Sequence, residues 1–125
     1  VTIDGSGTYD CSTTSTEPCL MTANGGSSGA ILNCHHAAQC IIQCTPAGGS
    51  KSLQQTTINA QNSGELIMYS GSQSECFKGG TINLPHSGSA YLYDAPGEKT
   101  YRETTINAGP NTQNIYVECN GGANG

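Results

Sequence analysis

The chain has 125 residues, a net charge of −5, 17 Gly and no Trp, and only 10% of its residues are charged. This length holds one domain at most, and four scattered cations are too few for a phosphate-binding surface, which argues against nucleic acid as a partner. No apolar stretch approaches the roughly 20 residues of a membrane-spanning helix, so no membrane partner is expected. Short β-branched or aromatic runs between turn residues indicate a β-rich chain.

Thr-Ile-Asn is the clearest repeated unit. It occurs three times at a constant spacing, at residues 57–59, 81–83 and 105–107. A second apolar run follows each copy at the same spacing, at residues 66–69, 90–93 and 114–117. A fixed period of about 24 residues predicts stacked structural repeats rather than a globule.

The repeat extends toward the N-terminus with less regular spacing. Thr2-Ile3-Asp4 and Ile31-Leu32-Asn33 both match the start of a repeat. The alignment predicts a single domain over residues 1–125, made of about five coils of about 24–25 residues that start near residues 3, 32, 58, 82 and 106. The first two coils are longer and absorb insertions at residues 12–18 and 45–55.

Side chains alternate between the two faces of a strand, which predicts which residues form the core. In the Thr-Ile-Asn strands Ile points inward, and the outward ladder consists of Thr57, Asn59, Thr81, Asn83, Thr105 and Asn107. Coils stacked at about 4.8 Å place like residues above one another, so the Asn amides can hydrogen-bond along the stack. In the second strand, the inward residues are expected to include Cys40, Ile42, Cys44, Ile115 and Val117, while the orientation of the tyrosines stays open.

Seven cysteines in so short a chain indicate an oxidising compartment and an extracellular or cell-surface location. They are Cys11, Cys19, Cys34, Cys40, Cys44, Cys76 and Cys119. Zinc is the rival interpretation, but no C-x-x-C pair occurs, and His35 and His36 are adjacent, which suits one tetrahedral site poorly. Disulfides are therefore expected, and no cofactor or metal.

The stacking suggests disulfide partners. Cys19 and Cys40 open the second strand of successive coils and could bond to each other. Cys11 with Cys34, and Cys44 with Cys76, are further pairs to consider. Cys119 then remains for a bridge to a neighbouring subunit.

Three segments resemble the right-handed parallel β-helix repeat proteins, especially their disulfide-rich extracellular versions. They are Cys40-Ile41-Ile42-Gln43-Cys44, Cys76 followed by Thr81-Ile82-Asn83, and Val117-Glu118-Cys119. The resemblance implies an all-β fold, a short right-handed parallel β-solenoid. It implies no particular activity, because this fold hosts lyases, adhesins, tail fibres and structural filaments.

The two ends of the chain suggest self-assembly. The sequence shows no capping element, and a second copy placed after Gly125 would bring its Ile3 slightly less than one period after Ile106. Head-to-tail contacts that do not close generate filaments. We therefore expect a structural, homopolymeric subunit of an extracellular filament or appendage with an axial repeat near 24 Å, about five strand spacings. The expected assembly interface consists of Val1, Thr2, Ile3, Tyr116, Val117, Glu118 and Cys119.

Little in the sequence indicates catalysis, so no enzyme is expected. Among nine carboxylates only Asp94 and Glu118 stand one period apart, a weak calcium candidate. Two alternatives stay open: a carbohydrate- or ice-binding module that uses the Thr-x-Asn face, and a fragment of a β-helix polysaccharide lyase or hydrolase. Glycans are also candidate partners, because a Ser/Thr-rich segment before Pro18 suggests O-glycosylation at Ser12, Thr13, Thr14, Ser15 and Thr16.

Overall fold

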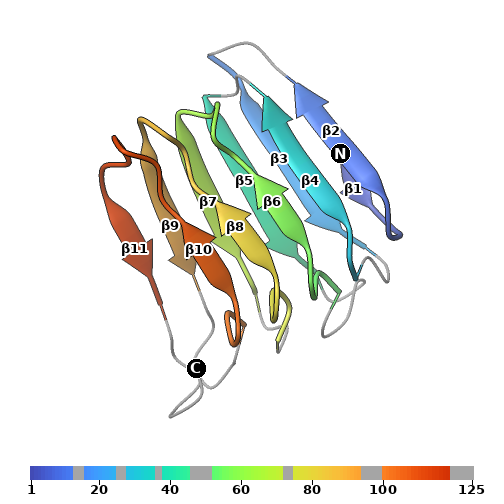
Figure 1. The fold of residues 1–125 in the computed structure, drawn as a ribbon. Helices are drawn as coiled ribbons and strands as arrows, with labels where there is room; N and C mark the ends of the chain where they lie inside the picture. Colours follow the sequence, from blue (N-terminus) through green and yellow to red (C-terminus); the bar gives the residue numbers. More distant parts are fainter. Residues whose placement is uncertain are drawn as a thin grey trace.

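The computed structural model describes residues 1–12, 16–24, 28–35, 38–45, 52–71, 75–93 and 100–118. In these residues there are only strands and turns, and the strands form two parallel sheets that lie face to face (Figure 1). No helix in this part of the chain is long and apolar enough to cross a membrane.

Successive strands alternate between the two sheets. The six-stranded sheet contains, in spatial order, β1 (Thr2–Ile3), β3 (Pro18–Ala23), β5 (Gln39–Cys44), β7 (Glu65–Tyr69), β9 (Ser89–Tyr93) and β11 (Ile115–Val117). The five-stranded sheet contains β2 (Thr8–Ser12), β4 (Ile31–His35), β6 (Thr57–Asn59), β8 (Thr81–Asn83) and β10 (Thr105–Asn107).

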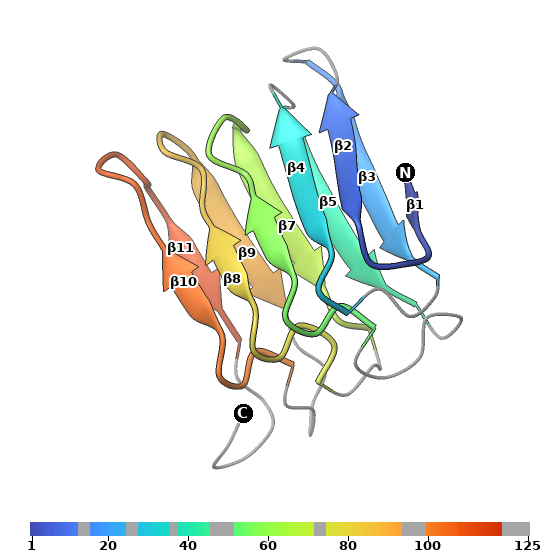
Figure 2. The same ribbon diagram turned by 45° about the vertical axis from the view of Figure 1, so that its right-hand side comes forward.

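This alternation makes the chain a parallel β-solenoid, as the sequence predicts. Four full turns separate β2 from β10, and β1 and β11 add a half-turn at each end, so the solenoid has about four turns rather than the expected five coils. Figure 2 shows β1 and β11 at opposite ends of the stack.

In the five-stranded sheet the register of the C-terminal turns follows the constant period of the sequence, whereas in the six-stranded sheet Ile115, and not Asn114 as expected, lies opposite Ala90. Ile58 lies opposite Ile82, which lies opposite Ile106, and Leu32 continues the row. The expected coil start at Ile3 is wrong. β1 pairs with β3 in the six-stranded sheet, and Tyr9 is the residue opposite Leu32. A three-letter match was too short to distinguish the two sheets.

The core is a narrow row of apolar side chains between the sheets. Ile58 and Ile82 are buried, whereas Ile106 is only partly buried, because β10 is the last strand of the five-stranded sheet within the described residues. Ala108, which strand alternation places on the inward side just after β10, is exposed for the same reason. In the six-stranded sheet the expected inward residues Cys40, Ile42 and Cys44 are buried, and the tyrosines of β7 and β9 point outward.

A third apolar row closes the corner that leads into the five-stranded sheet. It consists of Leu53, Phe77 and Tyr101, which are buried and stand one period apart. The rings of Phe77 and Tyr101 stack with centroids 5.6 Å apart and planes 7° apart, and the Tyr101 hydroxyl donates to the Tyr93 carbonyl at 3.0 Å. The core expected from the sequence did not include this row, although it shares the spacing of Thr-Ile-Asn.

Two backbone requirements recur at the corners. The residue two positions before each strand from β4 to β10 adopts a left-handed φ, and it is Gly29, Gln55, Gly79 or Glu103. At the opposite corner Gly88 lies so close to the turn below that a Cβ would overlap the Gly64 carbonyl oxygen. Only glycine fits there, which keeps the turns at strand spacing.

Candidate functional site

The residues predicted to form an assembly interface lie at the two edges of the six-stranded sheet. At the N-terminal edge Val1 and Thr2 are exposed and Ile3 is buried. The amides of Thr22 and Asn24 donate to the carbonyls of Val1 and Ile3, each at 2.9 Å. Because backbone groups alternate in direction along a parallel strand, those of Thr2 point away from the sheet.

The C-terminal edge is the other end of the same sheet. The Ala90 amide donates to the Asn114 carbonyl and the Glu118 amide to the Leu92 carbonyl, both at 2.9 Å. The backbone groups of Ile115 and Val117 therefore point away from β9. Tyr116 is exposed, Val117 and Glu118 are partly buried, and Cys119 lies outside the described residues.

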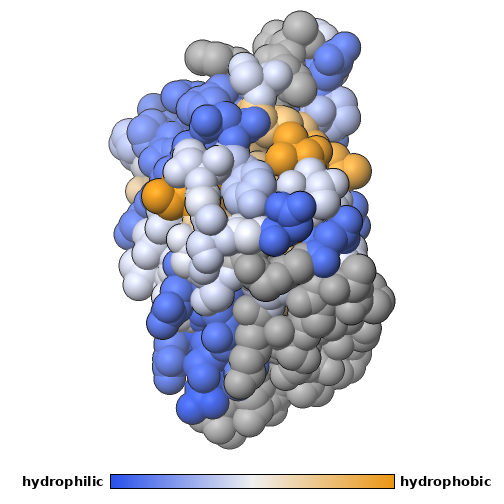
Figure 3. All heavy atoms as spheres, turned by 90° about the vertical axis from the view of Figure 1, so that its right-hand side faces the viewer, coloured by the Kyte–Doolittle hydropathy of each residue, from blue (hydrophilic) through white to orange (hydrophobic). Residues whose placement is uncertain are grey.

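The two ends differ in how well they cover the core. At the N-terminal end Tyr9 packs against the core and its hydroxyl donates to Asp4 at 3.3 Å, next to the Cys11–Cys19 disulfide. Figure 3 views this end and shows small apolar patches within a largely hydrophilic surface. At the C-terminal end Ile115, which continues the inward column of Ala90, is 47% exposed. The core is therefore covered at one end and open at the other.

The predicted Asn ladder is present on the outer face of the five-stranded sheet. Each amide nitrogen donates to the oxygen of the residue in the turn before it, at 2.7–2.9 Å, through Asn33, Asn59, Asn83 and Asn107. The first acceptor is Asp10, not Asp4 as aligned from the sequence, because Asp10 lies opposite Asn33. The Thr row beside it is interrupted at Ile31, which lies between Thr8 and Thr57.

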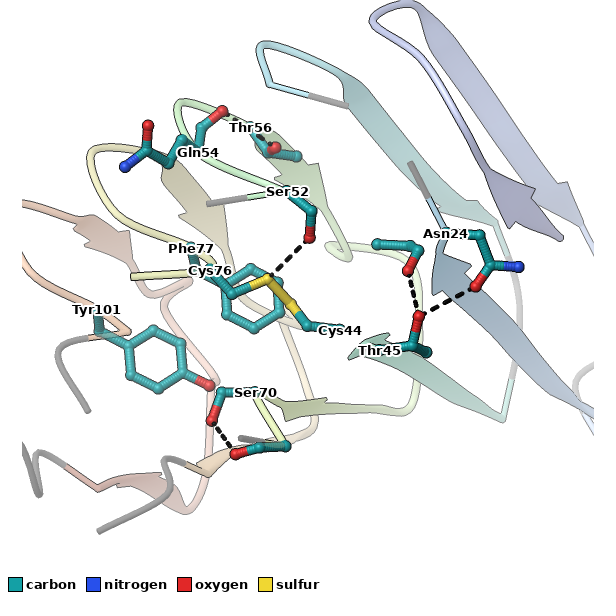
Figure 4. Close-up of a disulfide and its surroundings, with 12 residues drawn as sticks. Asn24, Cys44, Thr45, Ser52, Gln54, Thr56, Ser70, Cys76, Phe77 and Tyr101 are labelled. Carbon is teal, nitrogen blue, oxygen red and sulfur yellow. Dashed lines mark hydrogen bonds between the residues drawn. A yellow bond between two sulfur atoms is a disulfide. The ribbon is translucent and has the colours of Figure 1, made fainter. Parts of the chain in front are cut away.

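The described residues contain three disulfides, two in the first two turns and one that extends to the corner before β8. They join Cys11 to Cys19, Cys34 to Cys40, and Cys44 to Cys76. The suggested Cys44–Cys76 pair is confirmed. Figure 4 shows this disulfide, which joins the end of β5 to the corner before β8, beside Ser52 and Phe77.

The other two suggested pairs are wrong. Cys19 does lie opposite Cys40, and Cys11 opposite Cys34, but stacked neighbours point the same way, into the core. Each sulfur meets the cysteine that faces it from the other sheet within its own turn. Because Cys34, Cys40 and Cys44 are in disulfides, they cannot serve as thiolate ligands for zinc.

The outer face of the six-stranded sheet carries a tyrosine cluster. The rings of Tyr69 and Tyr93 stack with centroids 5.3 Å apart and planes 11° apart, and the Tyr116 ring lies 5.8 Å from that of Tyr93 at 50°. Partial burial, followed by the neighbouring Tyr69, Tyr116 and Tyr91 phenols, raises the pKa of Tyr93 above its usual value.

The described part of the chain contains no group of three or more His, Cys, Asp or Glu side chains that could hold a metal ion, and Asp94 lies outside it. His35 Nε2 lies 3.6 Å from Asp10 Oδ1, with both side chains largely exposed. A shallow hollow of about 360 Å³ is lined by turn residues, among them Gln61, Asn62 and His86. Of the O-glycosylation candidates, Ser12 and Thr16 are exposed and residues 13–15 lie outside the described residues.

The chain matches no protein-family model, no curated protein and no solved structure.

Proposed function

We propose that the chain is a structural subunit that assembles head to tail into an extracellular filament or appendage. The observation that carries this proposal is that β1 and β11 are the two edge strands of one parallel sheet, as far as the described residues show it. Both present outward-pointing backbone groups, at Thr2 on one side and at Ile115 and Val117 on the other. Edges of this kind pair readily with another strand.

The registers within the sheet specify how two copies would join. Val117 lies opposite Leu92, so Glu118 continues the column of Tyr93, and that column leads through Tyr69 back to Thr2. A second copy stacked in the same columns places its Val1 over Val117 and its Thr2 over Glu118. In this register the inward and outward sides of the two strands match, so the join would cover Val117 at the open C-terminal end of the core.

The strand counts change the expected axial repeat. The six-stranded sheet sets the spacing, so each copy advances six strand spacings, about 29 Å rather than 24 Å. The five-stranded sheet then has one strand position open at each join, because it contributes one strand fewer.

An extracellular location is part of the proposal. Three disulfides within so short a stretch support it, because disulfides persist in oxidising compartments. They are also what supports assignment to the disulfide-rich, extracellular type of β-helix. A Cys119 bridge to the next subunit stays a prediction, and it would appear on a non-reducing gel as a ladder of multimers that collapses on reduction.

The Thr-x-Asn face supports a binding function less well. Each Asn amide within the ladder already uses its oxygen and one N–H for its neighbours, which leaves less hydrogen-bonding capacity for a sugar or ice. A chain that stays monomeric at every concentration would favour the binding module instead.

Thr2→Pro is the sharpest test of assembly. Proline removes the outward N–H of β1 without removing a hydrogen bond within the chain, because the groups of Thr2 point away from β3. We expect the circular dichroism spectrum and melting temperature to stay unchanged while electron microscopy shows that the filaments disappear.

Thr8→Pro is the matched control. The Ile31 amide donates to the Gly7 carbonyl at 2.8 Å, so the N–H of Thr8 also points outward, at the edge of the five-stranded sheet where the join leaves a position open. Filaments of this variant should persist. If both variants, or neither, lose filaments, the join is not made through β1.

A further inference from the structure

One apolar row runs the whole length of the outer face of the six-stranded sheet. In register from β3 to β11, it consists of Leu20, Ile41, Ile67, Tyr91 and Tyr116. Leu20 and Tyr116 are 44% and 48% exposed, and the residues between them are partly exposed because they pack against each other along the row. Of this row only Tyr116 belongs to the expected head-to-tail interface, and the core uses none of it.

The neighbouring row adds to the same surface. It contains Thr22, Gln43, Tyr69 and Tyr93, of which Tyr69 is 42% exposed. On the other side lie Gln39 and Glu65, and the Gln39 amide donates to the Glu65 carboxylate at 2.9 Å. Glu65 is the one charged residue at an outward position within the described strands of this sheet, and Glu118, just after β11, continues the outward column of Tyr93. The face is therefore nearly uncharged on a chain whose net charge is −5.

The opposite face has another character. The outer face of the five-stranded sheet carries Asp10, His35 and the Asn ladder, whose amides bond to one another. Its polar groups are largely satisfied by hydrogen bonds, whereas the six-stranded sheet exposes apolar area. A solenoid with one such face has a single side on which burial is strongly favourable.

The geometry of the Tyr69 and Tyr93 rings indicates what kind of partner could bind to this face. A sugar ring stacks on the flat face of an aromatic side chain, but Tyr69 and Tyr93 cover each other's faces and direct their edges outward. An uncharged row of aliphatic side chains and ring edges suits packing against another sheet, at about 10 Å between sheets.

The area indicates how such packing would be used. The five strands from β3 to β11 at about 4.8 Å, and about five residues at about 3.3 Å, give a footprint of about 400 Å². A pair of copies would then bury about 800 Å², less than the roughly 1,200–2,000 Å² of a stable interface. Repeated along two filaments, the same contact gains from avidity.

We propose that this face pairs laterally with the same face of a second copy, so that two head-to-tail filaments associate side by side. The pairing of filaments rests on the proposed function, because it requires head-to-tail filaments. The contact between two copies does not depend on it. The contact is isologous, with the apolar row of each copy packed against that of the other.

A charge in the middle of the row tests the contact. Ile67→Lys and Ile67→Glu each place like charges on both partners, so each variant alone should give single filaments where the wild type gives pairs in electron micrographs. A mixture of the two variants should restore pairs, which a merely structural effect of Ile67 would not do. Thr81→Lys, on the outer face of the five-stranded sheet, is the matched control and should leave the pairs intact.

The Thr2→Pro chain separates this inference from the proposed function. It cannot extend, so sedimentation equilibrium at high protein concentration should show a weak dimer that Ile67→Lys weakens at least tenfold. A Thr2→Pro chain that remains monomeric, or wild-type filaments that stay single, would overturn lateral pairing and leave head-to-tail assembly untouched. If the wild type forms no filaments but the weak dimer is observed, head-to-tail assembly is overturned and the lateral contact stands.

Discussion

The N-terminal and C-terminal halves of the solenoid hold the same corner together by different means. In the first two turns, the corner between the five-stranded and six-stranded sheets contains the disulfides Cys11–Cys19 and Cys34–Cys40. The registers continue these columns into Ala60 and Leu84 on one side and into Leu66 and Ala90 on the other. A covalent bridge in one half is thus replaced by a large side chain facing a small one in the other.

The difference follows from how well each half can stack. The N-terminal turns have irregular lengths, so like residues do not recur at a constant spacing, and a crosslink supplies what packing does not. The Thr-Ile-Asn strands of the C-terminal turns repeat at a constant period, and these turns gain aliphatic rows, the Phe77–Tyr101 stack and the Tyr69–Tyr93 stack. Regular repeats stabilise each other through neighbour contacts, which explains why these turns need no crosslink at that corner.

The largest expected effect concerns the bridge that joins the two halves. Cys44–Cys76 closes a loop of 32 residues, against 6 for Cys34–Cys40. Removing it with Cys44→Ala and Cys76→Ala should lower the free energy of unfolding by about 4 kcal/mol by the chain-entropy estimate. Urea unfolding followed by circular dichroism measures this, with Cys34→Ala and Cys40→Ala as the short-loop comparison. An equal loss in both would show that loop length does not govern stability here.

A second prediction concerns replacing a disulfide of the N-terminal half with the pair of apolar side chains found in the C-terminal half. Cys34→Ala with Cys40→Leu copies the Ala60 and Leu66 pair of the next turn. Loss of the short loop costs about 2 kcal/mol, but the buried Leu should make this variant about 2 kcal/mol more stable than Cys34→Ala with Cys40→Ala. Urea midpoints of the two variants give the difference directly. If Leu at residue 40 does not raise the stability, the space at this corner fits only the disulfide. A large side chain facing a small one could then not replace the bridge in this half.

The sequence predicted the regular half better than the irregular one, for a physical reason. Where Thr-Ile-Asn recurs at a fixed period, identical residues stack, and the faces and the Asn ladder follow from strand alternation alone. In the first turn the equivalent strand contains Tyr9 and Asp10 instead of Ile and Asn. The alignment of Thr-Ile-Asn therefore placed this strand wrongly at Ile3. The disulfide partners depended on which sheet faces which, information that stacking order does not contain. The corner row of Leu53, Phe77 and Tyr101 could have been found by extending the same period to isolated apolar residues.

The smallest expected effect concerns the left-handed corner position, which both halves share. Gly29 and Gly79 fill it without strain, whereas Glu103 holds φ at 58° with a side chain. Glu103→Gly should therefore raise the free energy of unfolding by about 1 kcal/mol, since a side chain in this conformation costs about 1–2 kcal/mol. The ion pair that Glu103 makes with Arg102, at 3.7 Å and exposed, offsets little of this gain.

Gly79→Ala at the same position of the preceding turn supplies the reversed control and should lose a similar amount, with urea midpoints as the measure for both. If Glu103→Gly destabilises the chain, the Glu103 side chain does more for the last turn than its exposed ion pair indicates. If it stabilises, backbone strain at the corner limits the open end of the solenoid. In the described residues, the last turn has no disulfide at either corner and no further turn above it. It should therefore gain more than the other turns from a second copy stacked upon it.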